Sequence, residues 1–294
     1  METKLIVEVD GATPVNLLAE ASGLSKTRIK TVMTRGAVWL TRSGKQRRLR
    51  RAKSSLKAGD ELAIYYNAAI IDTAPPEPQK LADEGDWSAW FKPTGLLSSG
   101  SRFGDHCAIN RWVEQHENRP VFLVHRLDAQ TEGIMLLAHT RGAAAKLSQA
   151  FSARKVSKIY TAEVQGEFPP EPITCSEPVD GTEARTEFNL ILHAEASSLV
   201  SCRPITGRKH QVRVHLAWLG YPLTGDHLYG ATERGRFRLT ATALTFPCPV
   251  TGELRELELP AHLNQFASTR EDDGINLTTA PCSQIGSTTK PDSQ

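Results

Sequence analysis

Apolar residues recur at helical spacing in some stretches and alternate with polar residues in others, which predicts a chain that mixes helices and strands. Near the N-terminus, residues 17–21 have one apolar helical face, and Gly23 follows as a stop signal. A second helix is predicted from the cap residue Ser25 to Gly36. Alternation at residues 38–40 and 62–66 predicts short strands. The first part of the chain should therefore form a small unit of two helices and a few strands.

The middle of the chain alternates between the same two patterns over a longer stretch. A helix capped by Thr140 and a second helix that begins at Gly207 and ends at Gly220 are predicted from apolar spacing. Strands are predicted at residues 87–91, 121–124, 134–138 and 158–164. Periodicity alone thus supports a mixed α and β structure.

Chain length and local composition divide the sequence into four parts. At about 150 residues per domain, 294 residues suggest two domains. Residues 68–86 contain several prolines and acids without a helical or strand period, and we expect a linker there. Residues 268–294 have too few apolar side chains to offset ordering entropy, so a disordered tail is predicted. We therefore expect domains at residues 1–67 and 87–267.

Charge is distributed unevenly, although the formal net charge is only +2. Residues 1–67 carry 13 Lys and Arg against 6 Asp and Glu, and the stretch from Ser25 to Lys57 holds 12 basic residues and no acid. Such a stretch attracts phosphates by counterion release, or it forms a solvated charged surface. The composition alone leaves both interpretations open.

Membrane, disulfide and metal chemistry have no support in the sequence. The longest apolar runs are far shorter than the roughly 18 residues that span a bilayer, and the N-terminus lacks the features of a signal peptide, so we expect a cytosolic protein. The 5 cysteines are widely spaced and form no C-x-x-C pair. We expect free thiols, no metal, no cofactor and a monomeric protein.

The N-terminal pattern resembles the alpha-L RNA-binding motif. The resemblance rests on residues 25–30, 35–38 and 56–62, although a basic run stands where a short hairpin is common. It implies that this unit binds RNA through Lys26, Arg28, Lys30 and Arg35.

Three polar groups in the second part are candidates for chemistry. Asp128 lies in a polar loop between two apolar strands, where it either caps the local backbone or acts as a catalytic carboxylate. Tyr160 falls on a predicted strand and is consistent with a core aromatic side chain. Arg213 lies near the start of a predicted helix, where it is free to meet a carboxylate, a phosphate or solvent.

Taken together, the motifs of residues 87–265 resemble the RluA-type pseudouridine synthases. The matching motifs, in family order, are Lys92-Pro93-x-Gly95, His125-Arg126-Leu127-Asp128-x-x-Thr131-x-Gly133, Phe151 to Val164, Gly207 to His215, Gly225-Asp226-x-x-Tyr229-Gly230, and Leu244 to Glu253. Two departures stand out: Glu132 replaces the usual Ser, and Leu97-Ser98-Ser99 replaces the usual Val-His-Pro.

The resemblance implies a fold and a set of roles. The fold is α+β, with a curved, mostly antiparallel sheet and flanking helices, preceded here by the small alpha-L unit. Asp128 is the catalytic carboxylate, Tyr160 stacks on the target uracil and Arg213 pairs with Asp128. Arg126 fills the place vacated by the extruded base. The resemblance also makes His125, Arg208, His210 and Gln211 candidate RNA contacts.

The implied activity is the isomerisation of uridine to pseudouridine, which needs no cofactor. Ribosomal RNA of the large subunit is the favoured substrate, because an alpha-L unit accompanies many family members that act on it. A tRNA substrate, or an inactive RNA-binding assembly factor, is the alternative. A kinase is excluded because there is no Gly-rich phosphate loop or Asp-Phe-Gly. A zinc deaminase is excluded because Pro-Cys-x-x-Cys is missing.

Overall fold

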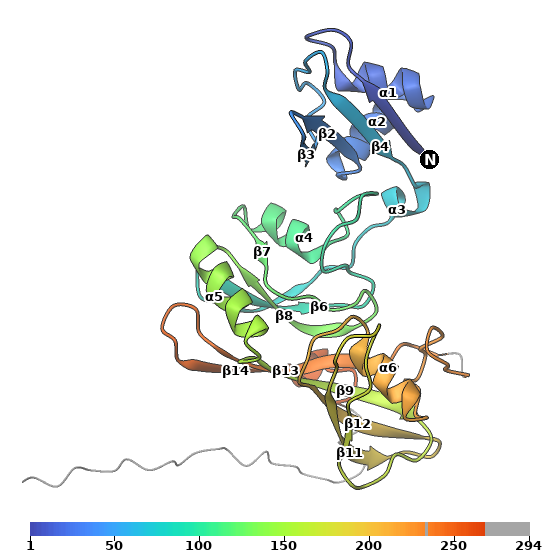
Figure 1. The fold of residues 1–294 in the computed structure, drawn as a ribbon, viewed down its shortest axis with the longest axis vertical. Coiled ribbons are helices and arrows are strands. Elements are labelled where there is room, and N and C mark those ends of the chain that lie inside the picture. The colour runs from blue at the N-terminus through green and yellow to red at the C-terminus, as the bar shows by residue number, and fades with distance from the viewer. Residues whose placement is uncertain (233–234, 268–294) are drawn as a thin grey trace, which may run out of the picture.

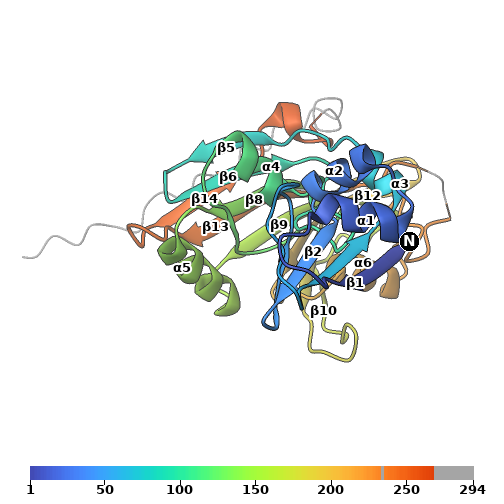
Figure 2. The same cartoon turned by 90° about the horizontal axis from the view of Figure 1, so that it is seen from above.

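The computed structural model describes residues 1–232 and 235–267. The tail 268–294, for which disorder is predicted, lies outside the described residues. Within the described part, an N-terminal unit forms one end of the molecule, and α6 with β11 and β12 lies at the other end (Figure 1). Figure 2 shows α5 well to one side of the N-terminal unit.

The N-terminal unit, residues 1–67, packs two helices against a small sheet with strand order β1-β4-β2-β3. Its elements are β1 (Glu2–Ile6), α1 (Pro14–Ser22), α2 (Lys26–Thr34), β2 (Val38–Arg42), β3 (Lys45–Arg48) and β4 (Glu61–Tyr65). The predicted helix signals are confirmed: Gly23 ends α1 with φ 71°, and the Ser25 hydroxyl accepts a hydrogen bond from the Arg28 N–H. Buried Leu18, Ile29 and Leu62 belong to one shared core.

We expect residues 68–86 to form a linker, but two segments of this stretch form regular secondary structure. The linker prediction is wrong for these two segments. Helix α3 (Ala68–Asp72) is capped by Asn67 and buries Ile71 in the N-terminal core. Strand β5 (Gln79–Asp83) pairs antiparallel with the next strand, β6. Pairing with a partner strand is not visible in local periodicity, so tertiary contacts override the weak local pattern here.

The second part of the chain is built on one large sheet of order β10-β11-β12-β9-β13-β8-β6-β5, with β14 beside β13 and β7 beside β8. Its remaining strands are β6 (Trp87–Lys92), β7 (Phe122–Leu123), β8 (Glu132–Ala138), β9 (Ser157–Gln165), β10 (Ile173–Cys175), β11 (Thr186–His193), β12 (Ser197–Pro204), β13 (Leu239–Pro247) and β14 (Leu254–Glu258). Among the pairings between these strands, only that of β13 with β8 is parallel. The mostly antiparallel sheet of the predicted α+β fold is confirmed.

The parallel β13–β8 pair explains one glycine of the sequence motif that contains Asp128. Gly133 opposes Ala241, and its φ is 120°, a conformation that L side chains rarely adopt. A Cβ at this position would collide with the Ala241 backbone. The glycine therefore allows β13 to lie directly beside the start of β8, next to the Asp128 loop.

The helices of this part are α4 (Ile109–His116), α5 (Arg141–Ser152), α6 (Gln211–Trp218) and a short 3-10 helix (Ala261–Leu263). The predicted cap of α5 is confirmed, because the Thr140 hydroxyl accepts a hydrogen bond from the Ala143 N–H. The prediction for α6 begins too early. His210 has φ 57°, so helical geometry starts only at Gln211, and residues before it form a loop.

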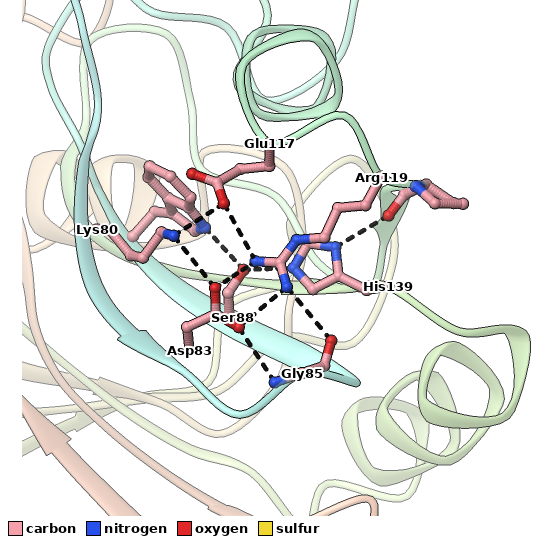
Figure 3. A network of polar contacts seen from close by, with 9 residues as sticks. Lys80, Asp83, Gly85, Ser88, Glu117, Arg119 and His139 are labelled. Carbon is pink, nitrogen blue, oxygen red and sulfur yellow. Dashed lines mark hydrogen bonds and ion pairs between the residues drawn. The ribbon is translucent and has the colours of Figure 1, made fainter.

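A polar cluster holds β5, β6 and the segment after α4 together (Figure 3). Arg119 donates to both oxygens of Asp83, at 3.0 and 2.5 Å, and Lys80 donates to Glu117 at 2.9 Å. Behind them, the Ser88 hydroxyl lies 2.7 Å from Nε2 of buried His139. The hydrogen bond from Arg119 holds the pKa of the Asp83 carboxyl well below its usual range. This cluster fixes β5 and β6 at the end of β8 that lies away from the Asp128 loop.

Candidate active site

The predicted catalytic residues come together from three separate elements. Asp128 lies in the loop between β7 and β8, Tyr160 lies on β9 and Arg213 lies in the first turn of α6. All three line one cleft with a volume of about 510 Å³. The loop 204–210 completes its wall. The fold therefore gathers residues that are 85 positions apart in the sequence.

The Asp128 carboxylate lies near two nitrogen atoms but forms a close contact with neither. Its Oδ2 is 3.8 Å from Nη1 of Arg213, and its Oδ1 is 3.7 Å from Nε2 of His210. Both distances exceed hydrogen-bonding range. The side chain is 20% exposed, and no described residue donates a hydrogen bond to it. Its oxygens are thus available to a molecule in the cleft.

Arg213 lies within ion-pair distance of Asp128, as the resemblance implies, but its hydrogen-bonded partner is Asp226, which the sequence did not identify. Nε and Nη2 of Arg213 each donate a 2.7 Å hydrogen bond to one Asp226 oxygen. Both side chains are buried, at 5% and 1% exposure. This two-pronged pair fixes the guanidinium plane and leaves Nη1 facing Asp128. Asp226 belongs to the quoted Gly225-Asp226 motif, but its loop position gave no local sign of its partner.

Tyr160 contributes an aromatic ring to the cleft from the middle of β9. Burial and the nearby Asp128 charge raise the pKa of its hydroxyl. The group therefore remains neutral across the physiological range. What it offers a bound molecule is a flat apolar surface and a neutral hydroxyl, not a charge.

His210 forms the rim of the cleft beside Asp128. Its Nδ1 lies 2.8 Å from the Tyr229 hydroxyl, and its backbone adopts the left-handed conformation. Burial lowers its pKa, so the ring is neutral near neutral pH. Tyr229 in turn lies under the Arg213 guanidinium, 4.9 Å from its centre.

Two of the predicted RNA contacts form hydrogen bonds within the protein, His125 through Nε2 and Gln211 through both ends of its amide. The His125 ring accepts a hydrogen bond from the Leu136 N–H at 2.8 Å and stacks on Phe151. Burial lowers its pKa to about 3. The Gln211 side chain donates to the Arg185 carbonyl and the Thr186 hydroxyl and accepts from Thr206. Both residues line the cleft, but these bonds make them supports of its walls.

The other cleft candidates differ in their freedom to reach RNA. Arg126 is exposed, and like Asp128 it lines both the main cleft and a second hollow. Arg208 is also exposed, but its Nε donates to the Glu183 carbonyl at 2.9 Å. Of these two arginines, Arg126 is the one shared by both hollows.

The N-terminal candidates divide in the same way. Lys26 and Lys30 are exposed on α2. Arg28 donates to both oxygens of Asp72, at 2.6 and 2.7 Å. Arg35 is partly buried, and Nη1 of its guanidinium is shielded from solvent. Two of the four predicted contacts therefore present a free cation to solvent.

Sequence reasoning assigned no role to two buried polar groups near the cleft. Lys92 of the Lys-Pro motif directs its Nζ at the carbonyls of Leu96 and Ala129, at 2.7 and 3.3 Å. Burial lowers its pKa to about 7. Glu132 is only 5% exposed and accepts a hydrogen bond from Arg236 at 3.0 Å. The unusual Glu at this position is thus balanced by a charge from another loop.

Within residues 1–232 and 235–267, no group of three or more acidic, His or Cys side chains is arranged to hold a metal ion. In the same part of the chain, no helix is both long and apolar enough to cross a membrane.

Comparisons with known proteins place these features in a family. Residues 86–218 match the family model described as RNA pseudouridylate synthase. The dual-specificity RNA pseudouridine synthase RluA of Escherichia coli is 34% identical over 195 residues, which cover 58% of this chain and 87% of that protein. RluA of Vibrio parahaemolyticus is 34% identical over 194 residues, with 58% and 77% coverage.

A longer relative matches over more of this chain. The human pseudouridylate synthase RPUSD2 is 30% identical over 229 residues, which are 70% of this chain but 41% of that protein. The chain thus spans less than half the length of this relative. Among solved structures, human RNA pseudouridylate synthase domain containing 1 has a TM-score of 0.54 at 23% identity, over 64% of this chain and 86% of that one. This likeness shows a shared fold.

Proposed function

Since this chain belongs to the RluA-type RNA pseudouridine synthase family, we propose that it is an enzyme that isomerises uridine to pseudouridine in RNA, with Asp128 as the catalytic carboxylate. The observation that carries the proposal is the open, partly exposed Asp128 carboxylate in a cleft shared with Tyr160 and Arg213. A structural carboxylate would be expected to have its oxygens occupied, as those of Asp226 are.

The reaction breaks the bond between N1 of uracil and C1′ of ribose and forms a bond between C5 and C1′. The base loses a proton from C5 and gains one at N1, so no atoms or electrons are exchanged with a co-reactant. An ionised carboxylate promotes the first step either by attack on C1′ or by removal of a ribose proton. The partly exposed position of Asp128 in the cleft lining suits both routes.

The other cleft residues bind and orient the base in this proposal. The Tyr160 ring provides a stacking surface that retains the detached uracil while it turns, because stacking tolerates rotation in the ring plane. The Arg213 guanidinium, held by Asp226, provides a fixed positive charge beside Asp128. Arg126 lies at the mouth and occupies the gap that the flipped nucleotide leaves in its helix.

We further propose that the N-terminal unit, an alpha-L module, binds the RNA backbone, and that the substrate is large-subunit ribosomal RNA. Support comes from the seven exposed basic residues that the unit presents in the basic stretch: Lys26, Lys30, Lys45, Arg47, Arg51, Lys53 and Lys57. Such a set attracts phosphates regardless of sequence. Base recognition then falls to the cleft.

The decisive experiment is pseudouridine mapping in total RNA from cells with the intact gene, without it, and with Asp128→Asn. We expect one or a few pseudouridines in large-subunit ribosomal RNA to vanish in the second and third strains. Glu171→Gln, an exposed acid remote from the cleft lining, serves as the matched control and should keep every site.

The outcomes separate the alternatives. Loss of sites in tRNA instead would assign a tRNA substrate. Unchanged pseudouridine in the Asp128→Asn strain would refute the catalytic role. A strain without the gene that keeps all pseudouridines, but accumulates unassembled ribosomal subunits, would indicate an RNA-binding assembly factor.

A further inference from the structure

A loop of the second part of the chain contacts both the N-terminal unit and the Asp128 loop. We call residues 97–108 the docking loop. It is held in shape by its own backbone: Leu97 N–H donates to the Cys107 carbonyl at 2.9 Å, and Ser101 and Gly104 exchange hydrogen bonds at its tip. The loop lies between the N-terminal unit and α4 in the fold. It is therefore a defined surface on which another unit can dock.

Asp105 in this loop binds two arginines of the N-terminal unit. Its carboxylate lies 3.1 Å from Nε of Arg48 and accepts a close hydrogen bond from Arg50. The three side chains are 12%, 17% and 25% exposed, so the contact is largely shielded from water. The Asp105 N–H also donates to the Arg35 carbonyl at 3.0 Å. Asp105 thus contacts three residues of the N-terminal unit, namely Arg35, Arg48 and Arg50.

Further contacts along the same interface fix its orientation. Arg48 donates to the Ser101 carbonyl at 2.8 Å, and the Trp39 indole N–H donates to the Arg102 carbonyl at 3.1 Å. Tyr65 and Phe103 pack edge to face, with ring centres 6.0 Å apart. Because these bonds have defined directions, they constrain rotation as well as distance.

The same loop is joined to the active site on its other side. The buried Ser98 hydroxyl donates to the Leu127 carbonyl at 2.6 Å, and the Leu127 N–H donates back to it at 2.9 Å. Leu127 directly precedes Asp128. The docking loop therefore contacts the backbone that carries the catalytic carboxylate and the unit that carries the basic surface.

We infer that Asp105, through Arg48 and Arg50, is a positioning residue that holds the N-terminal unit in one orientation, so that folded RNA bound there enters the cleft at a set distance. The RNA part of this inference rests on the proposed function. Arg48 and Arg50 then serve docking, whereas their exposed neighbours Arg47 and Arg51 serve phosphate binding. The basic stretch therefore contains residues that dock the unit and other residues that bind RNA.

This division permits a matched test in the full-length protein. The docking variant is Arg48→Gln with Arg50→Gln, and the surface control is Arg47→Gln with Arg51→Gln. Both remove the same charge from neighbouring positions. Asp105→Asn, a third variant, weakens the docking contact by removing its acidic partner and keeps all the cations of the N-terminal unit.

Small-angle X-ray scattering tests docking without any substrate. We expect a larger radius of gyration for the docking variant and for Asp105→Asn than for the wild type and the surface control. A docking variant with the scattering curve of the wild type would overturn the inference, whatever its activity. Far-ultraviolet circular dichroism of each variant checks that both units remain folded.

RNA measurements test the consequence. With ribosomal RNA transcribed in vitro, the salt dependence of binding should weaken for the surface control but not for the docking variant, since only the former loses phosphate contacts. The docking variant should lose about tenfold in kcat/KM on this RNA, because the tethered unit no longer presents it at a fixed distance. On a short stem-loop that holds the same uridine, its kcat/KM should be unchanged.

Equal losses on both RNAs would contradict the inference, because they would point to damage in the cleft. If the wild type forms no pseudouridine at all, the proposed function fails, while scattering and salt dependence still report on docking.

Discussion

Arg213 lies near two aspartates from different loops, and the two carboxylates differ in burial and in hydrogen bonding. Asp226, in the loop after α6, is 1% exposed and bound to Arg213 at 2.7 Å through both oxygens. Asp128, in the loop before β8, is 20% exposed and 3.8 Å from the same guanidinium. The difference separates a carboxylate that builds the site from one that is available to act in it.

The two loops are also held in different ways. The Asp226 loop is fixed through its carboxylate, which binds Arg213 and the Leu228 N–H. The Asp128 loop is fixed through the neighbours of Asp128, namely Leu127 by Ser98 and His125 by Leu136. Such an arrangement positions a reactive group without occupying it. Each of the three predictions below tests one part of this contrast.

The largest effect on stability is expected at Asp226. Asp226→Asn leaves the buried Arg213 charge without its partner, and the free energy of unfolding should fall by about 3–5 kcal/mol. Asp128→Asn, which breaks no hydrogen bond among the described residues, should change it by less than about 0.5 kcal/mol. Urea unfolding followed by circular dichroism measures both.

The rate of pseudouridine formation by these two variants should not correlate with their unfolding free energies. Asp128→Asn should remain fully folded and form no pseudouridine. Equal destabilisation by the two substitutions would mean that Asp128 is also a structural carboxylate, and the contrast between the loops would fail.

A smaller effect is expected at Ser98. Ser98→Ala removes one hydroxyl that serves both the N–H and the carbonyl of Leu127, so we expect a loss of about 1–3 kcal/mol in unfolding free energy. Turnover should fall as well, because the backbone next to Asp128 becomes less constrained. Ser99→Ala is the matched control, since Ser99 is exposed. Equal stability of the two variants would exclude Ser98 as the anchor of the loop.

Local signals predicted the elements well but not the contacts between distant loops. The caps at Ser25 and Thr140 act within one helical turn, and both are confirmed. The family motifs also named Asp128, Tyr160 and Arg213, which line one cleft. These features depend on neighbouring residues or on a known pattern.

Other features arise only when the chain is folded. The Arg213–Asp226 pair joins a helix to a loop, and Arg50 meets Asp105 across 55 positions of sequence. Strand β5 exists because β6 offers it a partner. Local periodicity does not predict these contacts, since each depends on burial and on the geometry of a partner that is distant in sequence.

The smallest effect, over the range from about pH 6.5 to about pH 5.5, is a pH dependence at His125, which anchors the Asp128 loop. Burial lowers the pKa of His125 to about 3 in the folded protein, whereas an unfolded histidine titrates near about 6.5. Below that value the unfolded chain binds a proton that the folded chain excludes. The neutral ring therefore stabilises the fold fully above about pH 6.5, and this contribution decreases by up to about 1.4 kcal/mol per unit as pH falls towards 3.

His125→Gln keeps a hydrogen-bond acceptor near the Leu136 N–H and removes the titration. Between pH 6.5 and 5.5 we expect the unfolding free energy of the wild type to fall more steeply than that of the variant, by about 1 kcal/mol. Urea unfolding at closely spaced pH values measures the difference, and the other buried histidines cancel because both proteins contain them. Parallel pH profiles would show that His125 titrates over the same pH range in the folded protein as in the unfolded chain, so that its ring is protonated below about pH 6.5. The ring could then not accept the Leu136 N–H, and the Asp128 loop would need a different anchor.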